Sequence, residues 1–403
     1  MATTAPTVTV DLAQAKRTLA QIEQEMTTMY LEREEAVRLA LVCQLSGQHG
    51  VYIGPPGTGK TTMLEELASR FCDPLGSGLT FFSTLLTRFT TVEELCGLPS
   101  FSGMKNDTLT RVITDMLPEA EIAFLDEIWK ASSAILNIIL KLIDQRKFKN
   151  GTVWMDCPLI SLFGASNELP EGNDLAAIRD RILFTYFVGY LSQPNFKLLM
   201  QRKAGLEPDP FTAPKTTMPR DVFFALRAHA ASLPFSPDVI EKIDAIREDC
   251  FKQGIQVSDR RNGQGLLTMQ ANAVIEERNQ VSEDDLPILT HAFWYELGQR
   301  KTVAGIVSKH SNPALARALE IKDEADSTFT QAMAQIEQLT ATNQRGQRSQ
   351  VASEASGKLQ VALEELEPLL KQHKTNKRIA AAYESVHKQN ITLLKTMGFK
   401  LNL

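Results

Sequence analysis

The chain has 403 residues, in which 43 lysines and arginines stand against 48 aspartates and glutamates. The formal net charge is therefore −5, and the sequence pI is about 5.8. Hydrophobic residues make up 43% and charged residues 23% of the chain. These ordinary values exclude collagen-like, wholly disordered and disulfide-scaffold proteins. The mild excess of acid argues against a protein that coats nucleic acid, although a local basic patch is compatible with it.

The cysteines and the N-terminus indicate the compartment. The five cysteines lie far apart, without a Cys-x-x-Cys pair, so neither a zinc site nor a disulfide framework is expected. Reduced thiols are typical of cytosolic proteins. The N-terminus has no basic region followed by an apolar run, and the chain has no uncharged apolar stretch of about 18 residues. We expect a soluble, cytoplasmic protein without a membrane span.

Taken in chain order, residues 1–205 alternate helical and strand patterns. Apolar residues recur at helical spacing over residues 9–49, where a charged stretch at 32–35 interrupts them. Asn150-Gly151 marks a tight hairpin within residues 148–157. The alternation predicts an α/β domain, a parallel sheet with helices on both faces. Its further helices are predicted at 60–71 and 132–145, and its strands at 51–53, 79–86, 122–125, 159–165 and 183–188.

The rest of the chain has a helical pattern. Four prolines between residues 206 and 219 indicate a domain boundary, and the pattern after them predicts a small all-α lid domain over residues 206–297. Residues 298–403 predict a helical C-terminal extension, with a flexible polar stretch at 340–357 and a kink or stop at Pro368. A heptad-like stripe near its end is compatible with a coiled-coil docking arm. A helix packed on its own domain is the more frequent arrangement.

The strongest motif is a glycine-rich stretch between a predicted strand and a predicted helix. It matches G-x-x-x-x-G-K-[ST], in which glycines let backbone N–H groups point at phosphate oxygens. Lys60 would bridge the β- and γ-phosphates, and Thr61 would offer a hydroxyl to Mg²⁺. The expected nucleotide site consists of Gly54, Pro55, Pro56, Gly57, Thr58, Gly59, Lys60, Thr61 and Thr62.

An apolar strand that ends in two acids follows downstream. Residues 122–127 read Ile-Ala-Phe-Leu-Asp-Glu, the pattern of a Walker B element. Asp126 would hold the Mg²⁺ shell, and Glu127 would polarise the attacking water. Asn167, just after the strand at 159–165, could lie between the nucleotide phosphate and that water.

Two pairs of arginines complete the pattern. Arg179 and Arg181 precede the last predicted strand, and we favour Arg181 as the group that reaches a neighbouring subunit's γ-phosphate. Arg260 and Arg261 follow Ser258, a helix-capping residue type. An arginine there could report the nucleotide state to the lid by contacting phosphate. The sequence does not decide which of the two points inward.

These elements, in this order, resemble AAA+ ATPases, and the resemblance narrows to the MoxR family. The strings Leu-Asp-Glu-Ile-Trp-Lys and Ser-Asn-Glu-Leu-Pro-Glu are most similar to its RavA-like branch. The resemblance covers residues 15–297, and we recognise no family module in residues 298–403. The segments that carry it are residues 54–61, 88–97, 117–121, 124–130 and 165–171.

The resemblance implies ATP and Mg²⁺ as cofactors, with hydrolysis at the subunit interfaces of a homo-oligomer, a hexameric ring. It implies a partner with a von Willebrand factor A (VWA) domain and a chaperone-like activity that remodels or activates client proteins. Insertions over residues 86–117 and at the hairpin would decorate the ring. The implied roles are nucleotide and metal binding for Lys60, Thr61 and Asp126, catalysis for Glu127, sensor 1 for Asn167, the trans-acting finger for Arg181 and sensor 2 for Arg260.

Two other functions remain open. Residues 146–151 read Arg-Lys-Phe-Lys-Asn-Gly, which would suit a nucleic-acid motor or loader that engages phosphates and stacks an aromatic on a base. The acidic chain weighs mildly against this function. A nucleotide-gated scaffold would need a damaged Walker B element or a missing finger, and neither is found. We expect Trp129 and Trp154 to be packing residues rather than ligand platforms.

Overall fold

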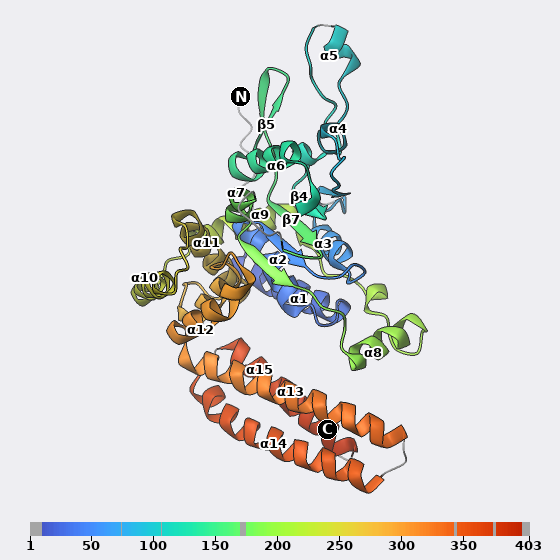
Figure 1. Ribbon diagram of the computed structural model, residues 1–403, viewed down its shortest axis with the longest axis vertical. Helices are drawn as coiled ribbons and strands as arrows, with labels where there is room; N and C mark the ends of the chain where they lie inside the picture. The colour runs from blue at the N-terminus through green and yellow to red at the C-terminus, as the bar shows by residue number, and fades with distance from the viewer. Residues whose placement is uncertain are drawn as a thin grey trace. The chain divides into compact units, whose positions relative to one another are not determined.

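A computed structural model describes residues 10–73, 75–105, 107–169, 175–341, 345–373 and 376–396. The chain divides into two compact units, Met1–Ala304 and Gly305–Leu403. Figure 1 shows the first as a sheet with surrounding helices and the second as a bundle of long helices. No helix in the described ranges is long and apolar enough to cross a membrane.

The first unit is built on a sheet of five strands in the order β3-β4-β7-β1-β8. Every neighbouring pair is parallel, so the five carboxyl ends meet at one edge. The chain leaves β1, β4 and β7 there, at the glycine-rich loop, the acidic pair and Asn167 respectively. The strands are β1 (Gly50–Ile53), β3 (Phe81–Leu85), β4 (Ile122–Asp126), β7 (Ser161–Ser166) and β8 (Phe184–Phe187).

Helices cover both faces of this sheet, which confirms the predicted fold class. The amphipathic α6 (Ser133–Gln145) packs Ile135, Ile139 and Leu142 against one face, and the side chain of Ser132 caps its first turn. On the other face, the Tyr52 hydroxyl donates a hydrogen bond to a carbonyl of α2. The other helices that flank the sheet are α1 (Leu12–Met29), α2 (Glu34–Ser46), α3 (Lys60–Ser69) and α7 (Ala176–Arg181).

The same unit continues into a group of helices after the sheet. The first of them packs through Phe223, whose ring stacks on Phe71 at 4.2 Å. A short parallel pair, β2 (Phe71–Cys72) with β9 (Met218–Pro219), precedes it. The helices are α9 (Arg220–Ser232), α10 (Pro237–Lys252) and α11 (Asp259–Ile275), followed by the 3₁₀ segments Glu283–His291 and Leu297–Gln299 and by α12 (Arg300–His310), whose residues after Ala304 belong to the second unit.

Three segments extend the sheet domain. One lies between β3 and β4 and holds α4 (Val92–Cys96) and α5 (Phe101–Lys105); another is the hairpin of β5 (Lys147–Asn150) and β6 (Val153–Asp156). The Asn150 amide joins the two, since it accepts from the backbone N–H of Arg111 (2.7 Å) and donates to the Arg111 carbonyl (3.1 Å). The third is α8 (Gln193–Lys203), whose residues are all at least partly exposed.

The second unit is a bundle of α13 (Pro313–Ala341), α14 (Arg345–Gln372) and α15 (Lys377–Thr396), which pack against one another around a common core. The flexible stretch expected at 340–357 is wrong: α14 already begins at Arg345. The buried residues of its first turns are small, Ala352, Ala355 and Ser356, so this face has no large apolar residue that would mark it as helical in the sequence. Pro368 lies inside α14 and does not stop it.

Candidate functional site

The glycine-rich loop follows β1 and curls at the carboxyl edge of the sheet. A Cβ atom on Gly54 would overlap the carbonyl oxygen of Val188, so only glycine fits at this point. Gly57 and Gly59 have φ angles of 76° and 78°, in the left-handed region that favours glycine. Gly59 then caps α3, whose first residue is Lys60. The loop therefore presents its N–H groups and a helix N-terminus at one place, which is an anion site.

The Lys60 side chain turns back into this loop. Its Nζ donates to the carbonyl oxygens of Gly54 (3.0 Å) and Pro55 (2.9 Å). Burial lowers the pKa of Lys60, while the charges of Asp126 and Glu127 oppose that shift. The ammonium thus lies near both acids of β4, as a group that balances phosphate charge must.

Glu127 lies directly after β4 in a left-handed conformation with φ 52°. Its Oε1 accepts from Asn167 Nδ2 at 2.9 Å and forms an ion pair with Lys130 Nζ at 3.3 Å. Its Oε2 is buried and has no hydrogen-bond partner among the described residues. The structure therefore brings Lys60, Asp126, Glu127 and Asn167 together from positions that are far apart in the sequence.

The residues at this edge fit a magnesium ion. Thr61 lies in the first turn of α3 and Asp126 ends β4, so a hydroxyl and a carboxylate are available beside the loop. Hard oxygen donors of this kind, completed by water and phosphate, are what Mg²⁺ prefers. The unpartnered Oε2 of Glu127 adds an oxygen that can accept from a water molecule.

Arg181 and Arg260 lie together in a second cluster, on the side of α7. Arg181 Nη2 contacts Asp144 at 3.2 Å, and its Nη1 donates to the Ala177 carbonyl at 2.8 Å. Arg260 contacts Asp144 at 3.6 Å and Asp180 at 3.4 Å. Thus the two arginines share one carboxylate.

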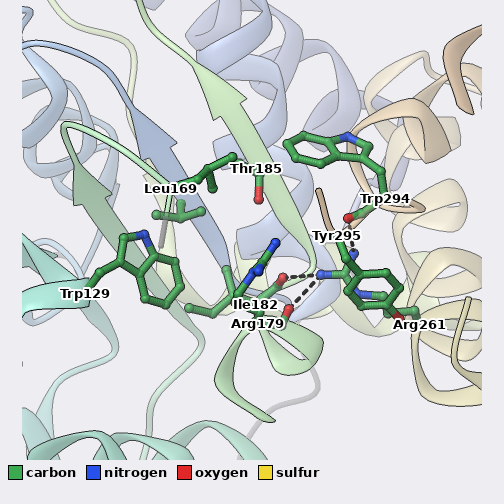
Figure 2. Close-up of a pocket in the computed structure, with 9 residues that line it drawn as sticks. Trp129, Leu169, Arg179, Ile182, Thr185, Arg261, Trp294 and Tyr295 are labelled. Carbon is green, nitrogen blue, oxygen red and sulfur yellow. Dashed lines mark hydrogen bonds between the residues drawn. The ribbon is translucent and has the colours of Figure 1, made fainter. Parts of the chain in front are cut away.

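Arg261, in contrast, is a buried residue of the lid junction. Its guanidinium donates to the carbonyl oxygens of Arg179 (2.7 Å) and Ile182 (2.8 Å), and it also bonds to that of Ala292. Burial lowers its pKa. Figure 2 shows it under the Tyr295 ring, at the side of a small pocket that Trp129 and Arg179 also line. Of the two candidates, Arg260 therefore has the more exposed side chain, at 40% against 3%.

Two residues near the loop were missed by sequence reasoning. The Tyr30 hydroxyl donates to the Thr62 carbonyl at 2.8 Å, and burial raises its pKa to about 12. The buried Arg33 donates to the Gly189 carbonyl at 2.7 Å, and its charge contributes to the lowered pKa of Lys60. The one signal was the charged stretch 32–35, which reads as a break between helices.

The hairpin lacks the expected stacking residue for nucleic acid. Phe148 is only 9% exposed and belongs to the sheet core, so it cannot stack on a base. The Arg146 guanidinium donates to the carbonyl oxygens of Gly47 (2.7 Å) and Ile160 (3.2 Å). Of the two tryptophans expected to be packing residues, Trp129 packs against the sheet core, whereas Trp154 is half exposed on β6.

Comparisons with known proteins give a family and a fold. Residues 17–222 match the family model described as the MoxR domain of MoxR-vWA-beta-propeller ternary systems, and residues 238–307 match an AAA lid domain. Two uncharacterized proteins of Methanocaldococcus jannaschii, MJ0812 and MJ0079, are each 35% identical. The matches cover 78% and 76% of this chain and 81% and 78% of theirs.

Two further matches are more distant. Structural protein ORF618 of Acidianus two-tailed virus is 26% identical over 42% of this chain and 27% of its own length. A crystal structure from Cytophaga hutchinsonii, provisionally described as an ATPase, superposes with a TM-score of 0.60 at 14% identity. It covers 75% of this chain and 96% of the other, and at that identity it shows the fold alone.

Proposed function

Since the chain belongs to the MoxR family of AAA+ ATPases, we propose that it hydrolyses ATP between the subunits of a ring and thereby remodels or activates client proteins. The observation that carries the proposal is the meeting of Lys60, Asp126, Glu127 and Asn167 at one edge of the sheet. A hexamer and the RavA-like branch remain finer predictions from the sequence strings. The cytoplasm as the compartment is likewise a prediction.

Each residue at the edge has a distinct task in hydrolysis. The loop N–H groups and Lys60 bind the phosphates, and Thr61 with Asp126 holds the metal. Mg²⁺ bound there would screen phosphate charge and fix the γ-phosphate. Glu127 orients the attacking water through its free Oε2, while Asn167 holds Oε1 in place at 2.9 Å. The Glu127 carboxylate is thus held in one orientation through Oε1 while Oε2 stays available to water.

The two arginines beside α7 act on a neighbouring subunit in this proposal. Arg181 and Arg260 contact Asp144, whereas Lys60 contacts the carbonyls of its own loop. A guanidinium brought across a subunit interface stabilises the charge of the transferring phosphoryl group. In this proposal both arginines act on the nucleotide of the neighbouring subunit, which departs from the simpler idea that Arg260 senses the nucleotide of its own chain.

A VWA-domain protein is the partner that we propose. The matched family is described from MoxR-vWA-beta-propeller systems, which supports a VWA partner and adds a β-propeller protein as a third component. The client is a protein that these partners present. Co-purification of the chain with its Glu127→Gln substitution, in ATP and Mg²⁺, would retain such partners on the ring.

Phosphate release tests the enzymatic claim directly. We expect Mg²⁺-dependent release by the wild type, and a loss of about 10²-fold or more in Glu127→Gln. Light scattering of the same variant with ATP should give the molar mass of a ring-sized assembly rather than that of a single chain. Equal background rates in both proteins would favour the alternative of a nucleotide-gated scaffold.

A nucleic-acid motor is the second candidate. It is favoured by the exposed Trp154, which pairs with the exposed Lys149 in the hairpin, and by the exposed Lys147 on the same strand as Lys149. Binding to single-stranded DNA should then weaken steeply between 50 and 200 mM salt, as it does for roughly 6–10 phosphate contacts. Absence of binding at about 50 mM salt, at which electrostatic contacts are strong, would remove this candidate.

A further inference from the structure

Asp144 lies in the last turn of α6 and contacts both arginines of the cluster. Its Oδ2 lies 3.2 Å from Arg181 Nη2, and its Oδ1 lies 3.6 Å from Arg260 Nη2. The carboxylate therefore uses one oxygen for each guanidinium. Because α6, α7 and α11 each contribute one of the three residues, the contact joins three helices that are separate in the sequence.

The position of this carboxylate is unfavourable for α6 alone. A negative charge near the C-terminus of a helix opposes the helix dipole, so an acid there needs compensation from outside the helix. Two guanidiniums supply it. At the surface of the cluster, the guanidiniums of Arg181 and Arg260 are balanced by the carboxylates of Asp144 and Asp180, because the third arginine, Arg261, is only 3% exposed.

The neighbouring contacts hold α7, the helix that carries Arg181, in place beside Asp144. Asp180 accepts from the Ser258 hydroxyl at 2.7 Å and from the Tyr295 hydroxyl at 3.3 Å, so α7 is tied to the start of α11. The Arg181 Nε is buried and has no partner among the described residues, which leaves Asp144 as the one acidic contact that we find for this guanidinium. Asp180 also contacts Arg260, and the Ala177 carbonyl also accepts from Arg181, but Asp144 is the carboxylate that contacts both arginines.

We propose that Asp144 is a positioning residue that holds Arg181 and Arg260 side by side, so that a subunit presents both guanidiniums to the triphosphate of its neighbour. The inference rests on the proposed ATP hydrolysis between subunits. Asp144 itself does not touch the nucleotide. Its removal frees the two side chains to separate, while the positive charge of the surface increases.

The first test separates orientation from charge. Asp144→Asn keeps the shape of the side chain but removes its charge, and we expect kcat to fall about tenfold while the KM for ATP is unchanged or lower. Asp244→Asn, at an exposed position within α10, is the matched control and should behave as wild type. A lower kcat in the control as well, or a wild-type kcat in Asp144→Asn, would overturn the proposal.

The second test asks on which side of the interface Asp144 acts. Glu127→Gln inactivates a subunit's own site but leaves its arginines intact, whereas Asp144→Asn does the reverse. Rings mixed at equal ratio should regain activity, because about a quarter of the interfaces then pair an intact site with an intact donor. If Asp144 served its own site, the mixture would be no more active than the sum of its parts, and the proposal would be wrong.

Two controls keep this outcome distinct from a failure of the proposed function. Arg181→Ala mixed with Glu127→Gln must regain activity in the same way; if it does not, hydrolysis between subunits is refuted rather than the role of Asp144. Binding of a fluorescent ATP analogue and the melting temperature report whether Asp144→Asn still folds. If it does not, Asp144→Glu, which keeps the charge but moves the carboxylate by one methylene, takes its place; a kcat that falls and recovers on mixing supports the proposal, and a kcat that falls without recovery on mixing counts against it.

Discussion

Asn167 Nδ2 donates a 2.9 Å hydrogen bond to Glu127 Oε1 across two neighbouring strands of the sheet. The bond joins the end of β7 to the end of β4. It places the amide against one carboxylate oxygen and leaves the other oxygen without a partner among the described residues. The pair therefore defines the direction from which Glu127 can receive a water molecule.

Replacing Asn167 by alanine should reduce turnover without affecting ATP affinity. The carboxylate would lose its fixed orientation, and we expect kcat to fall about 10²-fold, the usual range for a misplaced catalytic base. Steady-state phosphate release gives kcat, and a fluorescent ATP analogue gives affinity. A parallel loss of affinity would mean that Asn167 binds the nucleotide itself.

Gly54→Ala should abolish nucleotide binding and destabilise the protein. Its Cβ would overlap the Val188 carbonyl, which is backbone and cannot turn aside. We expect a loss of about 3 kcal/mol, the upper end of the usual cost of overpacking, because backbone atoms cannot move aside as a side chain can. Gly254→Ala is the control: φ is 75° there but nothing lies within 4 Å, so only about 1 kcal/mol of strain is expected. Comparison of melting temperatures checks both.

Arg261→Ala should lower mainly the stability of the protein, whereas Arg260→Ala should lower mainly its turnover. Arg261 satisfies buried carbonyls at the lid junction, so its loss should lower stability by about 2–4 kcal/mol. Arg260 is 40% exposed, and its loss should change stability by less than about 1 kcal/mol while it reduces turnover. Thermal unfolding gives the stability of each variant, and phosphate release gives its turnover. An equal loss of stability in both variants would contradict this distinction.

The stability of the first unit should fall in acid because of His49. Its Nδ1 accepts from the Leu162 N–H at 2.9 Å, and burial holds its pKa well below the usual 6.5. Below pH 6.5 the unfolded chain therefore binds a proton at His49 that the folded chain does not bind. The contribution of His49 to the free energy of unfolding is thus fully present above pH 6.5 and declines below it. The slope from this group is about 1.4 kcal/mol per pH unit. In His49→Asn, where an amide oxygen replaces Nδ1, denaturant titrations below pH 6.5 should show a correspondingly smaller slope.

The two aromatic residues of the hairpin should behave oppositely. Phe148→Ala removes a core side chain and should cost about 3–5 kcal/mol. Trp154 is half exposed, so Trp154→Ala should change stability by no more than about 0.5 kcal/mol. A large loss in the second variant would show that β6 is covered in the native protein.

The sheet and its site were predictable because their signals are local. Short apolar runs mark β1, β4 and β7, and the polar residues at their ends, Asp126, Glu127 and Asn167, must meet once the strands are parallel. Long-range packing gave no such signal. The inward direction of Arg261 depends on carbonyls of residues 179, 182 and 292, and the place of Tyr30 beside Thr62 depends on how α1 packs.

The helical extension was predicted, but the first turns of α14 were not, for a related reason. Alanines give weak periodicity, although Ala352 and Ala355 are buried in the core of the bundle. Pro368 was given too much weight, because a proline that loses one hydrogen bond can be tolerated when neighbouring helices pack along the rest of the helix. The pairing of Arg181 and Arg260 through Asp144 likewise depends on three helices whose arrangement no short motif encodes.

The reciprocal amide contact between Asn150 and Arg111 makes the two insertions mechanically one piece. The segment that carries Arg111 continues through the 3₁₀ segment Leu117–Glu119 into β4, which ends at Asp126, next to Glu127. In the proposed remodelling function, a displacement of the hairpin would therefore reach the strand that ends beside these two acids.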